Sequence, residues 1–163
     1  MNTMNSAEYN VQIHRVDRSN FERILPLIAA YQQFYRQVPD EARNRSFFSQ
    51  FLDDDSRGVM FGAFGPDGDA EGFATLYFVP SSLSAQLSCS FNDLYTIQEV
   101  RGAGVGVTLG LHCLMYARQR GFDKVSWLTS PSNEVARKIY EYTNARCSDW
   151  CSYELDLGAP EAV

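Results

Sequence analysis

The fold of this chain is set by the stretch Leu94-Tyr95-Thr96-Ile97-Gln98-Glu99-Val100-Arg101-Gly102-Ala103-Gly104-Val105-Gly106, which leads into a helical pattern ending at Gly121. An apolar strand runs into a glycine-rich turn, and the turn runs directly into a helix. Beyond the turn the apolar residues recur at helical spacing, which predicts a buried helix face made of Val107, Leu111, Leu114 and Met115. A glycine such as Gly121 is a common helix end, because it adopts positive φ freely.

The glycine turn is suited to holding phosphate. Gly102, Gly104 and Gly106 carry no side chain that would cover the backbone N–H groups at the helix start. These N–H groups and the positive end of the helix dipole favour an anion. A ligand-free turn is the alternative. A Rossmann-type dinucleotide site is disfavoured, because its glycine spacing differs and Asp123 precedes a predicted strand instead of following one.

A second pattern lies on the last predicted helix. Asn133, Ala136 and Tyr140 are spaced i, i+3 and i+7, so they share one helix face. A tyrosine hydroxyl is acidic enough to protonate a leaving thiolate, because the two groups have comparable pKa values. The alternative for Tyr140 is a tyrosine packed into the core.

Together these motifs resemble the GNAT superfamily of acetyl-CoA-dependent N-acetyltransferases. Arg101–Gly106 is similar to the signature Arg/Gln-x-x-Gly-x-Gly/Ala, and the preceding Asn92–Thr96 resembles the family's Asp-Leu-Tyr-Val strand. Asn133, Ala136 and Tyr140 match the second signature, Asn-x-x-Ala-x-x-x-Tyr. The resemblance covers roughly residues 92–145 and is nearest to the diamine/polyamine-acetyltransferase-like branch.

The resemblance implies an α/β, GNAT-like acyl-CoA N-acyltransferase fold. Its central sheet is expected to be mixed, mostly antiparallel and splayed between strands 4 and 5, with about four helices around it. The implied activity is acetyl transfer from acetyl-CoA (coenzyme A) to a primary amine of a small cationic acceptor by direct attack, with no metal. A non-catalytic acyl-CoA sensor or scaffold of the same fold is the alternative.

The resemblance also implies which residues hold the cofactor. The strand backbone would contact the pantetheine arm and acetyl group, and the glycine turn would hold the pyrophosphate. Asn133 would contact the arm, while Ala136 would keep the helix wall thin. The implied set on the strand and turn is Tyr95, Thr96, Ile97, Arg101, Gly102, Ala103, Gly104, Val105, Gly106 and Val107.

The same resemblance assigns an acid but no base. Tyr140 would protonate the thiolate, whereas polyamine-type relatives often carry an acidic residue where this chain has Asn92. Asn cannot hold a proton, and Glu99 would act only through water. Strand alternation directs Asp93 to the opposite face, where a structural hydrogen bond is expected. A water chain is therefore the predicted base.

The remaining sequence predicts an alternation of strands and helices. Strands are expected at about 9–16, 59–64, 72–79, 86–97, 125–128 and 150–157. Helix starts are expected at a capping box formed by Ser19 and Glu22, at Pro39, after Gly106 and at the N-cap Ser132. On the first two helices, Tyr31, Phe34, Tyr35 and Glu41 either line a site for a cationic amine or, in part, belong to the core.

Composition narrows the class of protein. The 163 residues fit a single domain, 1–163, with 45% apolar and 21% charged residues. No apolar run reaches a membrane span, and Met1–Asn10 lacks a signal-peptide pattern. Four cysteines without a Cys-x-x-Cys pair fit reduced thiols. We therefore expect a cytoplasmic protein without a membrane partner.

Charge points to the class of partner. A net charge of −6 argues against nucleic acid as a partner. Six basic and two acidic residues give the segment 101–138 a charge of +4, which leaves −10 for the rest. A basic segment around the glycine turn suits coenzyme A, and an acidic remainder suits a small-molecule amine. A homodimer through the strand near Trp150 is left open.

Overall fold

The computed structural model of the chain describes residues 9–158, apart from the side chains of residues 135, 139 and 142. The chain divides into two compact units, residues 1–128 and 129–163. The first contains β1 (Gln12–Arg15), α1 (Phe21–Phe34), α2 (Glu41–Phe48), α3 (Gln50–Asp53), β2 (Gly58–Phe64), β3 (Ala70–Ser81), β4 (Gln86–Thr96), the 3-10 helix η1 (Gln98–Val100), α4 (Val105–Gln119) and β5 (Val125–Ser126). The second contains α5 (Glu134–Tyr142).

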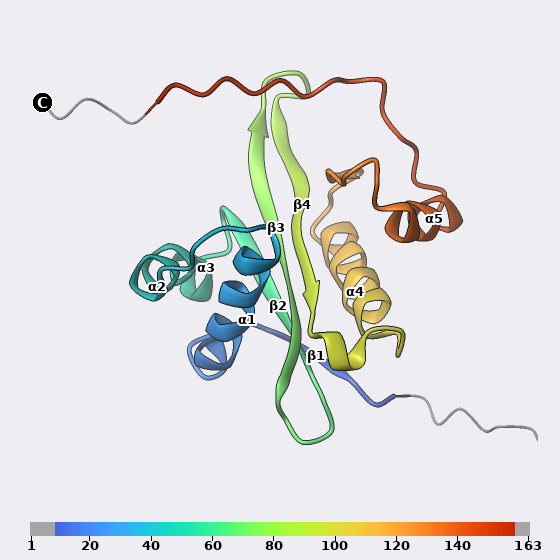
Figure 1. Ribbon diagram of the computed structural model, residues 1–163. Coiled ribbons are helices and arrows are strands. Elements are labelled where there is room, and N and C mark those ends of the chain that lie inside the picture. Colours follow the sequence, from blue (N-terminus) through green and yellow to red (C-terminus); the bar gives the residue numbers. More distant parts are fainter. Residues whose placement is uncertain (1–8, 159–163) are drawn as a thin grey trace, which may run out of the picture. The chain divides into compact units, whose positions relative to one another are not determined.

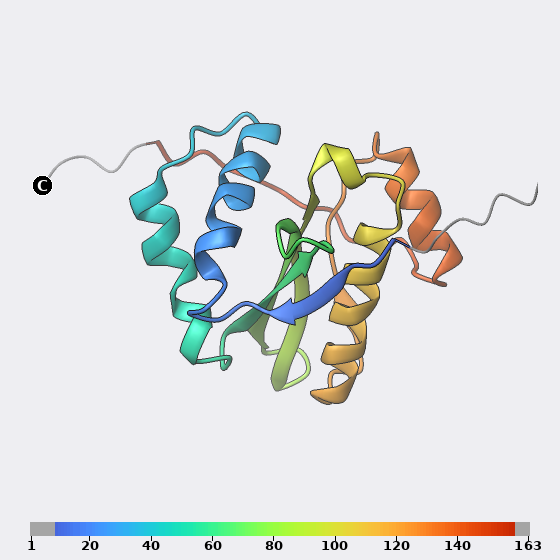
Figure 2. The same ribbon diagram turned by 90° about the horizontal axis from the view of Figure 1, so that it is seen from below.

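The first unit is built on one mixed sheet. Its strand order, β1-β2-β3-β4-β5, follows the chain. All neighbours are antiparallel except β4 and β5, which are parallel. Helices α1, α2 and α3 cover one face of the sheet and α4 covers the other (Figures 1 and 2). The predicted mixed, mostly antiparallel sheet flanked by helices is therefore confirmed.

The sheet opens between β4 and β5, as predicted. The two strands pair only at Cys89 with Val125 and at Ser90 with Ser126, whereas β4 continues to Thr96. A β-bulge interrupts the pairing with β3, because Thr75 lies opposite Asp93 while Leu76 lies opposite Phe91. Asn92 is thus the extra residue of β4, and such an insertion bends a strand and redirects its side chains.

Two apolar cores lie on the two faces of the sheet. On the α1 side, Ile24 and Ile28 pack with Met60 and Phe73 of the sheet. On the α4 side the core is formed by Val59, Leu76, Leu109, Cys113 and Ala117, among others. Consecutive residues of β2 enter opposite cores because strand side chains alternate. The central strands are therefore covered on both faces.

No helix of the described residues is long and apolar enough to cross a membrane.

The predicted buried face of the central helix is wrong. Val107, Leu111 and Met115 are 46%, 49% and 61% exposed, and Leu114 is half-buried. The sheet is instead covered by Val105, Leu109, Cys113 and Ala117. This helix carries two apolar stripes, so periodicity alone does not decide between them. The glycine turn before α4 sets the rotation of the helix, and it presents the other stripe to the sheet.

Two predicted N-caps are also wrong. Asn20 is the N-cap of α1, while Ser19 bonds through its backbone N–H and hydroxyl to the Asp17 carboxylate. The capping box fails because a tight turn before the helix engages Ser19 first. At α5 the N-cap is Asn133, one residue after the predicted Ser132. The start predicted near Pro39 is confirmed, because Asp40 caps α2 by accepting a hydrogen bond from the Arg43 N–H at 2.9 Å.

The predicted closing strand at 150–157 does not form. The described residues after α5 contain no strand, and their large apolar side chains are exposed. Trp150, Tyr153, Leu155 and Leu157 are 88%, 92%, 82% and 86% exposed. An alternating pattern predicts a strand only where a sheet edge accepts it, and the sequence does not specify that edge.

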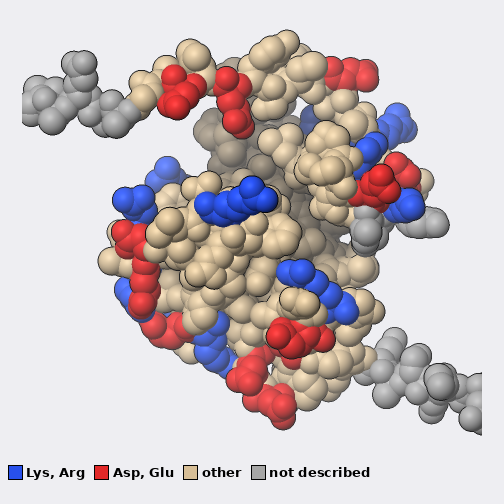
Figure 3. Space-filling model, in the orientation of Figure 1, with Lys and Arg blue, Asp and Glu red and all other residues tan. Residues whose placement is uncertain are grey.

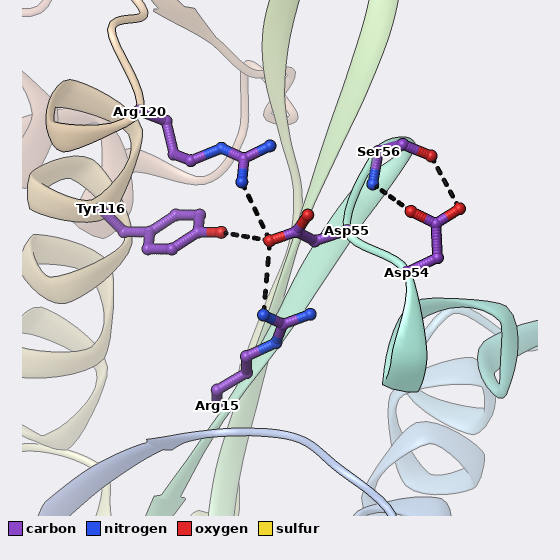
Figure 4. Close-up of polar contacts among 6 residues, drawn as sticks. All are labelled: Arg15, Asp54, Asp55, Ser56, Tyr116 and Arg120. Atoms are coloured by element: carbon purple, nitrogen blue, oxygen red, sulfur yellow. Dashed lines mark hydrogen bonds and ion pairs between the residues drawn. The ribbon is translucent and has the colours of Figure 1, made fainter.

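The first unit is tied together at one end by a carboxylate. Asp55, in the loop before β2, accepts hydrogen bonds from Arg15 of β1 at 3.3 Å and from Arg120 after α4 at 2.9 Å (Figure 4). The Tyr116 hydroxyl of α4 donates to the same oxygen at 3.2 Å (Figure 4). Elsewhere basic and acidic side chains lie side by side on the surface (Figure 3). One such pair joins Arg45 of α2 to Glu22 of α1. Asp55 therefore connects β1, the β2 entry and α4.

Replacing Asp55 by Asn should lower stability by about 1–2 kcal/mol, because two guanidinium groups lose their shared charged partner. We expect the Tm to fall by about 2–8 °C, and less at high salt. The matched control is Asp54→Asn, because among the described residues the Asp54 side chain bonds only to the neighbouring Ser56, and Asn can keep those bonds. Equal losses in the two variants, measured by thermal unfolding, would contradict a special role of Asp55.

Candidate active site

The glycine turn forms an open cradle at the start of α4. Gly102 and Gly104 have φ values of 86° and 87°, a conformation that favours glycine. Gly104 is the N-cap and makes no side-chain capping bond, and the first turn of α4 carries no acidic residue. A Cβ at either glycine would meet nothing within 4 Å. The backbone is therefore accessible on its outer side.

The cradle leaves backbone N–H groups free to bind an anion. The first helical hydrogen bond of α4 runs from the Thr108 N–H to the Gly104 carbonyl at 2.9 Å. The N–H groups of Val105, Gly106 and Val107 precede that bond and have no acceptor within the helix. They point along the axis at the positive end of the helix dipole. This donor set fits a diphosphate, and it needs no cationic side chain to do so.

The cradle lies beside the end of β4. A Cβ at Gly106 would stand 3.6 Å from Cγ2 of Thr96, and one at Gly110 would stand 4.0 Å from the Leu94 and Phe91 side chains. The first two turns of α4 therefore run along β4 where that strand has lost its β5 partner. The structure thus brings the predicted strand residues and the predicted turn residues together.

Arg101 is directed back to the strand. Its Nε and Nη2 donate to the Thr96 carbonyl at 3.3 and 3.2 Å. Its guanidinium carbon lies 5.8 Å from the Phe34 ring centroid and 5.9 Å from that of Tyr95. Arg101 therefore connects the cradle to the end of β4 and to the end of α1. Its contact with a pyrophosphate remains a prediction.

An aromatic group covers β4 on the α1 side. Tyr31 packs edge-on against Tyr35 at 5.0 Å and against Tyr95 at 6.2 Å, measured between ring centroids. Phe34 and Tyr35 are 63% and 58% exposed, so they are surface residues and not core. Glu41, the charge expected to accompany them, is exposed and paired with Arg45 at 3.0 Å. The aromatic residues thus form a partly exposed surface without that carboxylate.

Asp93 faces the same side of the sheet and is buried. The side-chain amide of Asn92 donates to its Oδ1 at 3.1 Å, while Oδ2 has no hydrogen-bond partner. Burial raises the pKa of Asp93, and the groups of Asn92, Tyr31 and Thr75 partly oppose that rise. The structural hydrogen bond predicted for Asp93 accounts for only one oxygen. The unpartnered Oδ2 could not be predicted from the sequence, because the bulge at Asn92 is a feature of strand pairing.

The second motif lies on α5, in the second unit. Asn133 accepts a hydrogen bond from the Ala136 N–H at 3.4 Å and donates through Nδ2 to the Thr129 hydroxyl at 3.4 Å. Ala136 and Tyr140 are half-buried and lie one turn apart on the helix. The structure therefore gives Asn133 a capping function. Contacts of these three residues with a cofactor remain predictions.

Other features of the first unit do not compete with this site. One hollow of about 510 Å³ is lined by polar residues around His14 and Arg23, and another of about 490 Å³ by Phe47, Phe51 and Tyr77 among others. Neither includes a residue of the cradle. Among the described residues no group of three His, Cys, Asp or Glu side chains is arranged to hold a metal ion. Burial raises the pKa of the Cys89 thiol to about 11, which makes it a poor nucleophile.

Comparison with known proteins agrees with this geometry. The sequence model of the acetyltransferase (GNAT) family matches residues 23–143. The uncharacterized N-acetyltransferase YhfO of Bacillus subtilis is 29% identical over 148 residues, which cover 91% of this chain and 93% of that protein. The crystal structure of a probable acetyltransferase is similar with a TM-score of 0.79 and 27% identity, over 91% of this chain and 99% of the other.

A more distant structure shares the fold. An aminoglycoside N-acetyltransferase in complex with CoA aligns with a TM-score of 0.76, over 92% of this chain and 97% of the other. Its sequence identity is 16%, so the similarity concerns the fold alone.

Replacing Gly106 by Ala should separate ligand binding from stability. Ala favours the helix by about 1 kcal/mol over Gly, and its Cβ would make only an ordinary contact with Thr96. The Tm should therefore hold or rise. The same methyl group would hinder close approach of a diphosphate to the backbone, so the affinity for acetyl-CoA should fall roughly tenfold or more.

The matched control is Gly110→Ala, one turn further along α4, where a Cβ would touch Leu94 and Phe91 at 4.0 Å. It should bring the same helix stabilisation and leave acetyl-CoA affinity unchanged. Calorimetric titration measures both variants. Equal affinities in Gly106→Ala and Gly110→Ala would show that the first turn of α4 does not contact the diphosphate.

Proposed function

Because the chain belongs to the acetyltransferase (GNAT) family, we propose that it moves an acetyl group from acetyl-CoA to the primary amine of a small cationic acceptor. Its class of activity, acetyl-CoA-dependent N-acetyl transfer, follows from the family and from relatives named as N-acetyltransferases. The kind of acceptor and the catalytic side chains are our proposal. The observation that carries it is the open cradle of backbone donors beside the unpaired edge of β4.

The chain's own residues would bind the cofactor largely through backbone. The segment Arg101–Val107 would hold the diphosphate, because its glycines leave the α4 N–H groups uncovered. Tyr95, Thr96 and Ile97 would direct strand groups to the pantetheine arm, with Asn133 and Ala136 contributing from α5. The bound cofactor supplies the acetyl group as a thioester. No metal is part of this proposal.

A small cationic amine fits the α1 side of the sheet. Tyr31 and Tyr35 offer aromatic faces at a partly exposed surface, and such faces attract ammonium groups. Outside the segment 101–138 the chain carries a charge of −10, which favours approach of a cation. The proposed acceptor therefore belongs with the diamines and polyamines of the branch that residues 92–106 resemble.

Tyr140 is the proposed general acid. It lies on the same face of α5 as Ala136, in the second family signature. Its hydroxyl would protonate the leaving thiolate, a group of similar basicity. This role requires Tyr140 to reach the sulfur when the cofactor is bound.

The wider setting completes the proposal. The family match at 23–143 crosses the boundary between the two units, which supports one functional domain over 1–163. Reduced cysteines fit a cytoplasmic protein. The exposed apolar side chains of 150–157 support a homodimer in which a second copy covers them.

The acceptor class is tested by thiol release from acetyl-CoA across polyamines, amino acids, aminoglycosides and lysine peptides. We expect release with small cationic amines, because the α1 surface is aromatic and the surrounding chain is acidic. Release only with lysine peptides would contradict the acceptor class. If no acceptor causes thiol release and acetyl-CoA does not raise the Tm, the assignment of acetyl-CoA as cofactor is contradicted.

The acid is tested by Tyr140→Phe, which removes one hydroxyl and keeps the ring. We expect turnover to fall about 100-fold, because general acids contribute on that scale, while acetyl-CoA affinity stays the same. Steady-state kinetics and calorimetric titration measure the two quantities. Unchanged turnover would remove Tyr140 from the acid role, and a parallel loss of affinity would make it a binding residue instead.

A further inference from the structure

Asp93 is a buried carboxyl group that neither the cofactor cradle nor the packing of the fold explains. It is 6% exposed, and its Oδ2 has no hydrogen-bond partner. The neighbouring Thr75 hydroxyl, fully buried, also has none. Buried polar atoms are nearly always hydrogen-bonded, and an unpartnered carboxylate oxygen costs stability. The burial of this carboxyl group therefore needs an explanation other than packing.

The bulge in β4 places Asp93 on the acceptor side. Asn92 is the extra residue, and beyond it Asp93 and Tyr95 alternate with Leu94 and Thr96. Tyr95 packs on Tyr31 and so marks the α1 face, whereas Thr96 lies beside Gly106 of the cradle. At about 3.3 Å per residue, Asp93 and Thr96 are about 10 Å apart along the strand. The carboxyl group is thus near the cradle but on the opposite face of the sheet.

Tyr31 connects this carboxyl group to the surface. Each affects the ionisation of the other: Asp93 helps to raise the pKa of Tyr31, after the larger effect of burial, and Tyr31 lowers that of Asp93. The half-buried Tyr31 ring also packs edge-on against the exposed Tyr35 at 5.0 Å. A small amine resting on the aromatic surface would therefore meet the Tyr31 hydroxyl before it met Asp93.

The groups that face Asp93 are uncharged at neutral pH. They are Tyr31 from α1, Thr75 and Tyr77 from β3, and Asn92 from β4. No cation is among them, so the effect of burial on Asp93 is not cancelled, and its pKa is raised. A carboxyl group with a raised pKa is a better proton acceptor near neutral pH than an ordinary surface aspartate.

We propose that Tyr31 and Asp93 form a proton-accepting pair for the acceptor amine, a role that rests on the proposed function. Tyr31 touches the amine, and Asp93 acts through it. The ammonium group gives a proton to Oη of Tyr31 while the Tyr31 hydroxyl gives its own proton to Oδ2 of Asp93. One N–H bond and one O–H bond break, and two O–H bonds form. The amine leaves this step neutral and nucleophilic.

The remaining steps balance the reaction. The neutral nitrogen forms a bond to the acetyl carbonyl carbon, and the carbon–sulfur bond breaks with its electron pair on sulfur. The general acid, Tyr140, gives a proton to the sulfur. The nitrogen then loses its second proton, which returns Tyr140 to its protonated form. Asp93 then releases its proton to water. The net products are the amide, the thiol and one proton, so no further reactant is needed.

The pair is tested first by the pH dependence of kcat/KM with an amine found active in the wild type. In Asp93→Asn and in Tyr31→Phe we expect a loss of about 100-fold at neutral pH. In Asp93→Asn the decline toward acid pH should instead follow the pKa of the amine, because only the neutral amine then reacts. Because the two residues act as one unit, the double variant should be no slower than either single one. A wild-type pH profile retained in Asp93→Asn would overturn the proposal.

An acceptor of low pKa separates proton acceptance from other roles. Hydroxylamine is largely neutral at pH 7, so it has no proton to give up before attack. If Asp93 contributes through proton acceptance, the loss of kcat/KM in Asp93→Asn should shrink to less than about tenfold with this acceptor. An equal loss with both acceptors would overturn the proposal. The matched control is Tyr77→Phe, which removes a hydroxyl on the same face and should keep the wild-type profile.

Stability gives a readout independent of turnover. The pKa of Asp93 is raised above its ordinary 3.8 by burial, so its stabilising form is the protonated one, present below pH 3.8 and lost as pH rises through the raised value. Asp93→Asn should therefore increase the Tm at pH 7–8 by about 2–4 °C, and this gain should vanish below about pH 4. A lower Tm at pH 7 would indicate a structural role and overturn the proposal.

The outcomes also separate this inference from the proposed function. If the wild type acetylates no amine, the proposed function fails and the proton step fails with it. If the wild type is active and Asp93→Asn matches it in rate and in pH profile, the proton-accepting pair fails alone.

Discussion

The parting of β4 from β5 after Ser90 is the constraint on which the site depends. Backbone donors and acceptors are normally paired, and here two sets lack partners in the same place: one edge of β4 and the N–H groups that open α4. The glycine turn makes the second set accessible, because two residues with positive φ carry no side chains over it. A ligand with a diphosphate and an amide-bearing arm satisfies both sets. The proposed binding site thus consists of backbone that the described part of the fold leaves unpaired.

In our proposal one strand, β4, contacts both the cofactor and the acceptor. On the α4 face of β4, Thr96 lies beside Gly106 and so beside the cofactor cradle. On the α1 face, Tyr95 and Asp93 lie under the aromatic group of Tyr31. The bulge at Asn92 sets this division, because one inserted residue changes which side chains face which helix. The acid and the cofactor contacts on α5 complete this arrangement in our proposal.

The elements that the sequence predicts closely are those whose structure is local. The glycine turn, the helix after it and the hairpin around 65–69 depend on the φ preferences of a few residues. The elements that it predicts wrongly are those whose pattern is compatible with two packing partners. The central helix has two apolar stripes, and the stripe that packs on the sheet is not the one predicted. The alternating residues 150–157 have the composition of a strand, but no sheet edge in the described residues pairs with them.

What the sequence alone determined is the family, the order of elements as far as α5 and the cradle, because signature residues and glycine conformations are properties of short segments. The tertiary structure decided the rest of the site. It turned Arg101 back to the Thr96 carbonyl, gave Asn133 a capping bond and left one oxygen of Asp93 unpartnered. It also brought Tyr31 of α1 to Asp93 of β4. These contacts join segments far apart in the chain, so they depend on strand register, and a single bulge is enough to change that register.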